Sequence, residues 1–276
     1  MTINCKGSLI DLSQPKIMGI LNVTPDSFFD GGQYQEKDSI LKRVTNMLDE
    51  GATFIDVGAY SSRPGAKHIS EQEELDRIVP IVQLLIAEFP DVLLSIDTFR
   101  SEVARACVEN GAAIINDISG GNMDENMLQT VAEIQVPFIM MHMKGTPQNM
   151  QQNVTYEDLL ADIIYYFSDK IKKARLLGIN DIILDPGFGF SKNIEQNYEL
   201  LQHLPLFQNL ELPLLIGLSR KSMIYKTLEN SPQEALNGTT ALNMIALDKG
   251  AQILRVHDVK QAKECVTLIS KLHQHL

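Results

Sequence analysis

The sequence predicts a single-domain α/β fold, a (β/α)8 barrel, and two features of the chain support that prediction. First, eight short apolar runs alternate with segments of helical periodicity, which is the pattern of parallel strands covered by helices. Second, a helical segment ends at a glycine four times along the chain, and an apolar run begins within a few residues of it. Consecutive glycines of this kind are 60 to 72 residues apart, the length of two strand–helix units. A doubly wound open sheet is the alternative fold for the same pattern.

Four of the predicted strands follow directly on a helix end. Glycine just past a helix end adopts the left-handed conformation that caps the helix, and the chain then enters the strand. These segments are EGATFIDVGA from Glu50, NGAAIINDIS from Asn110, LGINDIILDP from Leu177 and KGAQILRVHD from Lys249. The other four strands are KIMGILN (16–22), VLLSID (92–97), VPFIMMH (136–142) and LPLLIG (212–217).

The segments between the strands each have one apolar face, as helices that cover a sheet require. In the second predicted helix this face is formed by Leu75, Ile78, Val82, Leu85 and Phe89. The fifth predicted helix, at about 156–177, repeats the spacing with Leu160, Ile163, Ile164, Phe167 and Ile171. No linker-like segment divides the chain, so we assign one barrel domain at 16–276, preceded by a short N-terminal extension at 1–15.

Composition narrows the functional class. The chain of 276 residues has 24 lysines and arginines against 35 aspartates and glutamates, and its net charge of −11 argues against nucleic-acid binding. Its three cysteines, without a C-x-x-C pair, suggest neither a disulfide framework nor a zinc site. They favour a reducing compartment, so we expect a cytoplasmic protein. The first residues do not read as a signal peptide, and no apolar run is long enough to span a membrane.

Polar residues end every predicted strand. In a barrel of this type the binding and catalytic residues lie at the carboxyl ends of the strands, so these positions are the candidates for a site. In chain order they are Asn22, Asp56, Asp97, Asn116 with Asp117, His142, Asp185, the segment GLSRKS (217–222), and Arg255 with His257. Aspartate and asparagine also favour turns, so any single one of them is open to that simpler explanation.

The cations at these strand ends suggest an anionic ligand. Arg63, Lys221, Arg255 and His257 are expected at one rim of an otherwise acidic protein. Arginine offers paired N–H groups to phosphate oxygens, so this set fits a ligand with two negative charges. Arg255 and His257 are two residues apart on one strand and should therefore point to the same face.

The acceptors at the same rim suggest a different ligand group. Asp97, Asn116 and Asp185 suit a heterocycle rich in N–H donors, or a cation that develops during a reaction. Aromatic rings accompany them in glycine-bearing loops, namely Phe28, Phe188 and Phe190. These rings either fold back onto the core or stack on a ligand, and the sequence leaves both possibilities open.

Seven blocks near these strand ends resemble the dihydropteroate synthase family. In chain order they are ILNVTPDSFFDGG, SSRPGA, SIDTFR, IINDISGG, ILDPGFGF, LIGLSRKSMI and ILRVHDV. Seven blocks in the family's order are a highly specific match, and the resemblance extends over the chain from about residue 16 to about residue 272.

The resemblance implies a transferase of folate biosynthesis. The family condenses 6-hydroxymethyl-7,8-dihydropterin diphosphate with 4-aminobenzoate to give 7,8-dihydropteroate and diphosphate. It implies these two small molecules as substrates, Mg²⁺ as the cofactor and a homodimer as the assembly. The expected reaction is a substitution in which diphosphate leaves first, assisted by Mg²⁺ and the cations, and carboxylates favour the pterin cation before the amine attacks.

The resemblance also assigns roles residue by residue. The expected pterin contacts are Asp97, Asn116, Met140, Asp185 and Lys221. The expected diphosphate contacts are Asn22, which also faces the metal, Ser62, Arg63, Arg255 and His257. The expected 4-aminobenzoate contacts are Phe28, Pro64, Phe190, Lys221 and Ser222. Asp97, Lys221 and Arg255 are the expected catalytic residues.

The second loop departs from the family pattern. The family has Gly-Glu-Ser-Thr-Arg-Pro-Gly, whereas this chain has AYSSRPG at 59–65. Ser62 keeps a hydroxyl donor for an anion, but Tyr60 replaces the acid. Two alternative functions use the same barrel: a pterin-dependent methyltransferase with a corrinoid partner, and a pterin-binding protein without turnover. The methyltransferase would not need the SRK block or the cation pair of RVHDV, because no diphosphate leaves. The retained cations Arg63, Lys221, Arg255 and His257 argue against a protein without turnover.

Overall fold

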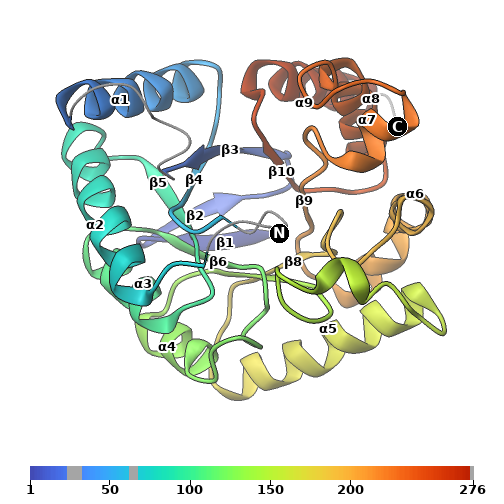
Figure 1. Ribbon diagram of the computed structural model, residues 1–276, viewed down its shortest axis with the longest axis horizontal. Coiled ribbons are helices and arrows are strands. Elements are labelled where there is room, and N and C mark those ends of the chain that lie inside the picture. The colour runs from blue at the N-terminus through green and yellow to red at the C-terminus, as the bar shows by residue number, and fades with distance from the viewer. Residues whose placement is uncertain (24–32, 62–67, 274–276) are drawn as a thin grey trace.

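The computed structural model of the chain describes residues 1–23, 33–61 and 68–273. Eight parallel strands lie in the hydrogen-bonded order β8-β7-β6-β5-β4-β3-β10-β9, with helices around them (Figure 1). The strands are β3 (Lys16–Asn22), β4 (Phe54–Gly58), β5 (Leu93–Asp97), β6 (Ile114–Asp117), β7 (Phe138–Met141), β8 (Ile182–Asp185), β9 (Leu215–Ile216) and β10 (Ile253–Val256). All eight predicted strands are therefore confirmed, with bounds that differ by a few residues.

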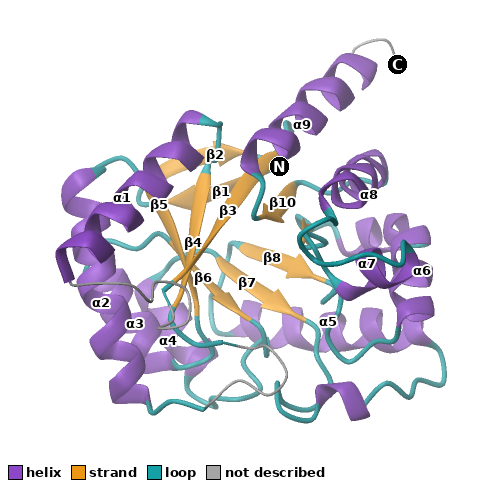
Figure 2. Cartoon of the chain, turned by 45° about the horizontal axis from the view of Figure 1, so that its top comes forward, coloured by secondary structure: helices purple, strands orange, loops and turns teal. Residues whose placement is uncertain are grey.

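The sheet closes on itself between β8 and β9. Leu184 of β8 forms a parallel bridge with Leu214, the residue before β9, and its backbone N–H donates to Pro213 O at 2.8 Å. The first and last strands of the order thus meet, which gives a barrel rather than the alternative open sheet. Figure 2 shows the strands enclosed by helices.

The helices connect successive strands and confirm the predicted alternation. They are α1 (Gln33–Asp49), α2 (Glu71–Glu88), α3 (Ser101–Glu109), α4 (Met127–Ile134), α5 (Leu159–Leu176), α6 (Ile194–Gln202), α7 (Ser222–Thr227), α8 (Leu236–Asp248) and α9 (Val259–His273), with 3-10 turns η2 (Met150–Gln152) and η3 (Leu204–Leu210). The four glycines at the helix ends have left-handed φ angles of 101°, 102°, 88° and 97° at Gly51, Gly111, Gly178 and Gly250. Such angles favour glycine, so these residues set the helix-to-strand turns.

Side chains on the two faces of the strands enter different layers. The outward residues, such as Val57 and Leu184, pack against the apolar helix faces in one continuous core. The predicted faces contribute to it, because Ile78, Val82 and Phe167 are all fully buried. None of the helices in the described part of the chain is both long and apolar enough to cross a bilayer.

The inward residues at the amino ends of the strands form a second, smaller core. It contains Met18, Phe54, Ala113, Ile114, Ile139, Ile183, Leu215 and Ile253. The N-terminal segment folds over this end as an antiparallel hairpin of β1 (Thr2–Cys5) and β2 (Ser8–Asp11). Ile3, Cys5 and Leu12 from this segment are buried in the same cluster, so the hairpin closes the amino end of the barrel (Figure 1).

Candidate functional site

Five polar side chains enter the barrel above the apolar layer, at the carboxyl ends of the strands. Because alternate residues of a strand point to opposite faces, the inward positions that follow the apolar ones are Asp56, Asp97, Asn116, Asp185 and Arg255. Asp56, Asn116 and Asp185 are 0%, 3% and 6% exposed. The side chains of Asp97 and Arg255 keep 18% and 21% of their surface exposed. The cluster lies between the core and solvent, where a ligand can reach it.

Arg255 connects the acids of two other strands. Its Nε donates to Asp56 Oδ2 at 2.6 Å, and its Nη2 donates to Asp97 Oδ2 at 2.7 Å. Asn116 Nδ2 also donates to Asp56 Oδ2, at 3.1 Å. The arginine expected at the diphosphate therefore contacts the aspartate expected at the pterin, which places the two expected subsites side by side.

Asp56 is a member of this site to which the sequence assigned no role. Its Oδ1 is buried without a hydrogen-bond partner among the described residues, and so is the hydroxyl of Ser95. These two residues are paired in the register of β4 and β5 and so share the inward face. Buried polar atoms are normally bonded, so these two are available to a ligand group. A signal was present in the sequence, because Asp56 follows Phe54 by two residues on one strand face.

Burial shifts the protonation of the charged groups. It raises the pKa of Asp97, an effect that Arg255 opposes and Asp56 increases. Burial also raises the pKa of Asp185, while Lys221 acts in the opposite direction. Conversely, burial lowers the pKa of Lys221 to about 8, although Asp185 favours its charged form. Lys221 is therefore mainly a cation at neutral pH but loses its proton more readily than an exposed lysine.

Lys221 reaches from the segment after β9 to the loop after β8. Its Nζ donates to the carbonyl oxygen of Phe188 and lies 5.0 Å from the ring centroid of Phe190. The two phenylalanines differ in their surroundings. Phe188 is fully buried and folds back onto the main core, whereas Phe190 is half-buried and packs at the barrel mouth. Only Phe190 is thus available to line a ligand.

The remaining described candidates lie on the same rim. His257 follows β10, and its Nδ1 is 2.9 Å from Ser219 Oγ. Arg43 of α1 donates to the backbone oxygen of His257 at 2.6 Å, which fixes that part of the rim. Asn22 is the last residue of β3, and Ser222 is the first residue of α7.

Met140 differs from its expected place. It is fully buried in the outer core that packs on the helices, because it follows the inward Ile139 by one position. Met141 instead pairs in register with Asp185 and clusters with Tyr60, Met143 and other apolar side chains at the barrel mouth. The sequence assignment was displaced by one residue, which moves a strand side chain to the opposite face.

Four of the expected site residues, Phe28, Ser62, Arg63 and Pro64, lie outside the described residues. The neighbouring Tyr60, which replaces the family's glutamate, is described. Its hydroxyl accepts a hydrogen bond from Gln148 at 2.8 Å and lies 3.2 Å from His68 Nδ1. Where the family has an acid, the phenol of Tyr60 thus joins the end of β4 to the segment after β7 through its hydrogen bond with Gln148.

Comparisons with known proteins agree with this geometry. Residues 18–257 match the model of the family described as pterin binding enzyme. The dihydropteroate synthase of Escherichia coli K12 is 44% identical over 271 residues, which cover 98% of this chain and 95% of that protein. The corresponding protein of Haemophilus influenzae is 43% identical, with 94% of each chain covered.

Solved structures show the same similarity in three dimensions. The dihydropteroate synthase of Yersinia pestis in complex with a sulfonamide drug matches with a TM-score of 0.93 and 46% identity, over 99% of this chain and 100% of that one. The dihydropteroate synthase of Xanthomonas albilineans with 4-aminobenzoic acid matches with a TM-score of 0.91 and 37% identity, over 99% and 98% of the two chains.

Proposed function

The chain belongs to the dihydropteroate synthase family of pterin-binding enzymes, and we propose that its barrel mouth is the site of that family's reaction. The protein is a transferase of folate synthesis that joins 6-hydroxymethyl-7,8-dihydropterin diphosphate to 4-aminobenzoate. The observation that carries the assignment to this site is the convergence of Asp97, Asn116 and Asp185 with two cations, Lys221 and Arg255, inside one end of the barrel.

We assign the pterin ring to the acids and the amide of this cluster. Asp185 uses Oδ1 to accept the backbone N–H of Gly187 at 2.8 Å, so its Oδ2 can accept N–H groups of the ring. Asp97 and Asn116 face the same space from β5 and β6. We assign the apolar wall of this subsite to Met141 instead of Met140, because Met141 shares the strand face of Asp185.

We assign the diphosphate to Arg255, His257 and Asn22, together with Ser62 and Arg63 of the second loop. The contacts of Arg255 set a condition on this binding. Because Asp56 and Asp97 take its Nε and Nη2 atoms, Nη1 is the nitrogen that can reach a phosphate oxygen while both carboxylate contacts remain. Arg255 would then bridge the leaving group and the acid beside the pterin.

A divalent metal fits this subsite as a partner of the substrate. The described residues contain no group of three acidic, histidine or cysteine side chains able to hold a metal by themselves. Asn22 offers one amide oxygen at the end of β3, and Mg²⁺ is commonly held by one or two protein oxygens with substrate phosphates. Bound Mg²⁺ would neutralise charge on the departing diphosphate.

We assign 4-aminobenzoate to the adjacent edge of the mouth. Phe190 offers an apolar ring there, with the Lys221 ammonium 5.0 Å from its centroid. Ser222 begins α7 beside Lys221 and offers polar groups to the carboxylate. Phe28 and Pro64 complete this subsite as expected from the family resemblance.

The geometry supports a substitution in which the diphosphate departs first. Arg255 and His257 hold the leaving anion, and Asp97 lies at the contact between Arg255 and the pterin subsite. A preorganised carboxylate at that point favours positive charge on the pterin methylene as the carbon–oxygen bond breaks. The amino group of 4-aminobenzoate then attacks that carbon and loses a proton. Its nitrogen needs little help from a base, because the cation is strongly electrophilic.

A diphosphate-release assay with both substrates tests the proposed reaction. Release that depends on 4-aminobenzoate supports it. Pterin binding without such release would instead favour a methyltransferase or a pterin-binding protein without turnover. We further propose that the protein is a homodimer, and analytical ultracentrifugation of the same preparations measures its molecular mass.

We propose a cytoplasmic location, which agrees with the three free and buried cysteines.

A further inference from the structure

The loop between β8 and α6 carries two parts of the proposed site. The carbonyl oxygen of Phe188 accepts a hydrogen bond from Lys221, and the ring of Phe190 lines the 4-aminobenzoate edge. The backbone of this loop is unusual, because Gly187 and Gly189 have φ angles of 74° and 78° and Ser191 has a φ of 46°. Glycine adopts such angles readily but serine does not, so a partner outside the backbone has to hold this loop at Ser191.

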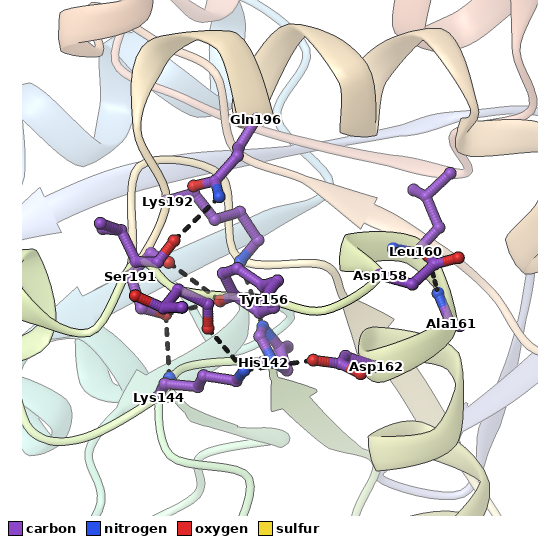
Figure 3. Close-up of polar contacts among 12 residues, drawn as sticks. His142, Lys144, Tyr156, Asp158, Leu160, Ala161, Asp162, Ser191, Lys192 and Gln196 are labelled. Carbon is purple, nitrogen blue, oxygen red and sulfur yellow. Dashed lines mark hydrogen bonds and ion pairs between the residues drawn. The ribbon is translucent and has the colours of Figure 1, made fainter.

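Lys192, at the end of this loop, is that partner. The residue is only 3% exposed. Its Nζ donates to the carbonyl oxygens of Gly187 at 3.0 Å and Phe190 at 3.1 Å, and lies 3.1 Å from His142 Nδ1. In its charged form the Lys192 side chain has three N–H groups and three acceptors, two of them in the loop and one at the end of β7. Figure 3 shows Lys192 beside His142.

His142 is suited to be the third acceptor. Burial lowers the pKa of Lys192 to about 7, an effect that Asp185 opposes. In its charged form Lys192 has no lone pair, so Nδ1 of His142 is then the acceptor and the imidazole proton lies on Nε2. Burial and the neighbouring cations Lys192 and Lys144 lower the pKa of His142, which keeps the ring neutral. The backbone of the loop also lies against the end of β7 here, since a Cβ at Gly187 would overlap the carbonyl oxygen of His142.

Other contacts hold the two neighbouring loops together around this lysine. Tyr156 donates its hydroxyl to the backbone oxygen of Ser191 at 2.9 Å, and Ser191 Oγ accepts the backbone N–H of Lys144 at 2.9 Å (Figure 3). Gln196 of α6 donates to Val154 O at 2.9 Å. These contacts fix the far side of the loop. Lys192 is the side chain that binds the Gly187 and Phe190 carbonyl groups together. The Gly187 carbonyl also accepts the backbone N–H of Phe190 at 3.1 Å, and Gln151 Nε2 donates to the Gly189 carbonyl at 3.3 Å.

A buried lysine costs more free energy than an apolar side chain of similar size, so packing alone does not explain it. Burying its charge costs free energy unless every hydrogen is bonded, and lysine is almost never fully buried without partners. Here the partners are the two carbonyl groups on either side of the Lys221 acceptor. Lys221 also packs against this loop, since a Cβ at Gly189 would lie 3.1 Å from its Cδ. Two lysines therefore bind carbonyl groups of the same loop, and Lys221 is the one assigned to the substrates.

We propose that Lys192 and His142 are positioning residues that preset the β8–α6 loop for 4-aminobenzoate. This proposal rests on the proposed function of the barrel mouth. In this proposal Lys192 does not contact the substrates. Lys192 fixes the Phe190 ring and the Phe188 carbonyl, and through them the direction of the Lys221 ammonium group. Displacement of such a group by about 1 Å lowers catalytic efficiency by up to about 10²-fold.

The first test compares Lys192→Met with Lys144→Met. Methionine keeps the long apolar stem of Lys192 but removes its three N–H donors. Lys144 is a matched control, because its Nζ contacts Thr155 O, Asp162 and the ring of Tyr156 but none of the loop carbonyl groups. For Lys192→Met we expect the KM for 4-aminobenzoate to rise at least about tenfold, with kcat within about threefold and pterin affinity nearly unchanged. Lys144→Met should remain close to the unmodified enzyme. Equal kinetics in all three proteins would overturn the proposal.

The second test separates positioning from folding and covers the case in which Lys192→Met does not fold. In His142→Asn the amide oxygen can replace Nδ1 as an acceptor, whereas His142→Leu offers none. We expect His142→Asn to retain most of the affinity for 4-aminobenzoate and His142→Leu to lose it, at similar melting temperatures. If both variants lose affinity only in proportion to lost thermal stability, the two residues are structural and the proposal is wrong.

Hydrogen exchange keeps this proposal distinct from the proposed reaction. Amides of residues 187–191 should exchange faster in Lys192→Met than in the unmodified protein or Lys144→Met, while those of α5 stay unchanged. That result supports the positioning role of Lys192 even if the unmodified protein releases no diphosphate. In that case only the proposed reaction would be wrong. If the amides of residues 187–191 exchange at the same rate in Lys192→Met as in the unmodified protein, the positioning role is wrong, whatever the enzymatic activity.

Discussion

The two ends of the barrel are built from the same eight strands but from opposite kinds of side chain. At the amino end, inward residues such as Phe54 and Ile139 are fully buried and sealed by the N-terminal hairpin. At the carboxyl end, the next inward positions on most of these strands are charged or polar, including Asp56 and Asp185, whereas β7 continues with the apolar Met141. One end therefore stabilises the barrel, and the other end holds groups that are suited to bind a polar substrate.

The polar end is the less stable of the two in electrostatic terms. Its acids and cations are desolvated, as the raised pKa of Asp97 and the lowered pKa of Lys221 show. Ion pairs to Arg255 offset only part of that cost, and a buried oxygen of Asp56 has no partner among the described residues. Perturbed groups of this kind concentrate at functional sites, so stability and activity should respond to different mutations.

The largest effect on stability is expected at the amino end. Phe54→Ala removes a fully buried ring from the layer under the hairpin. We expect the free energy of unfolding to fall by about 3–5 kcal/mol, while the protein that remains folded keeps kcat and both KM values within about twofold. Urea unfolding and assays well below the melting temperature measure the two quantities. A large change in KM would show that the two ends are coupled.

The largest effect on catalysis is expected at Asp97. Asp97→Asn keeps the shape of the side chain but removes the negative charge beside Arg255 and the pterin subsite. We expect kcat to fall by about 10²–10³, with pterin affinity reduced much less, because the charge acts mainly on the developing cation. Single-turnover kinetics and a binding titration separate the two. An equal fall in affinity and rate would mean that Asp97 only holds the ring.

A smaller effect is expected for the diphosphate contact. Arg255→Ala should weaken binding of the pterin diphosphate more than binding of a diphosphate-free pterin, by about 1.5–3 kcal/mol, since one charge-assisted contact is lost. Calorimetry with both ligands gives the difference. Arg105→Ala is the control, because Arg105 lies on α3 in an ion pair with Glu133. Equal losses for both ligands would move Arg255 into the pterin subsite.

The smallest effect is a pH dependence that belongs to Lys221. Burial lowers its pKa from 10.5 to about 8, so the charge is present below pH 8 and is lost as the pH rises through that value. We expect the KM for 4-aminobenzoate to be level up to about pH 7 and to rise by up to about tenfold per pH unit well above pH 8. Lys221→Met should show a high KM without this dependence. A rise that persists in Lys221→Met would assign it to another group.

Much of this architecture follows from local patterns. The eight strands, and the glycines that precede four of them, can be predicted because hydrophobic periodicity, turn residues and helix caps depend on only a few neighbouring residues. The position of Asp97, Asn116, Asp185 and Arg255 at strand ends likewise indicates them as site candidates from the sequence alone. Only knowledge of the family's motifs assigned these residues to particular substrates.

Tertiary structure alone decided which of these side chains meet. Arg255 contacts Asp56 and Asp97 from 199 and 158 residues away, and no local pattern specifies such a pair. Phe188 and Phe190 have similar local sequences, yet only closure of the barrel buries one and leaves the other at the mouth. Local interactions determine the elements and their faces, whereas the distances between faces depend on how the whole sheet closes.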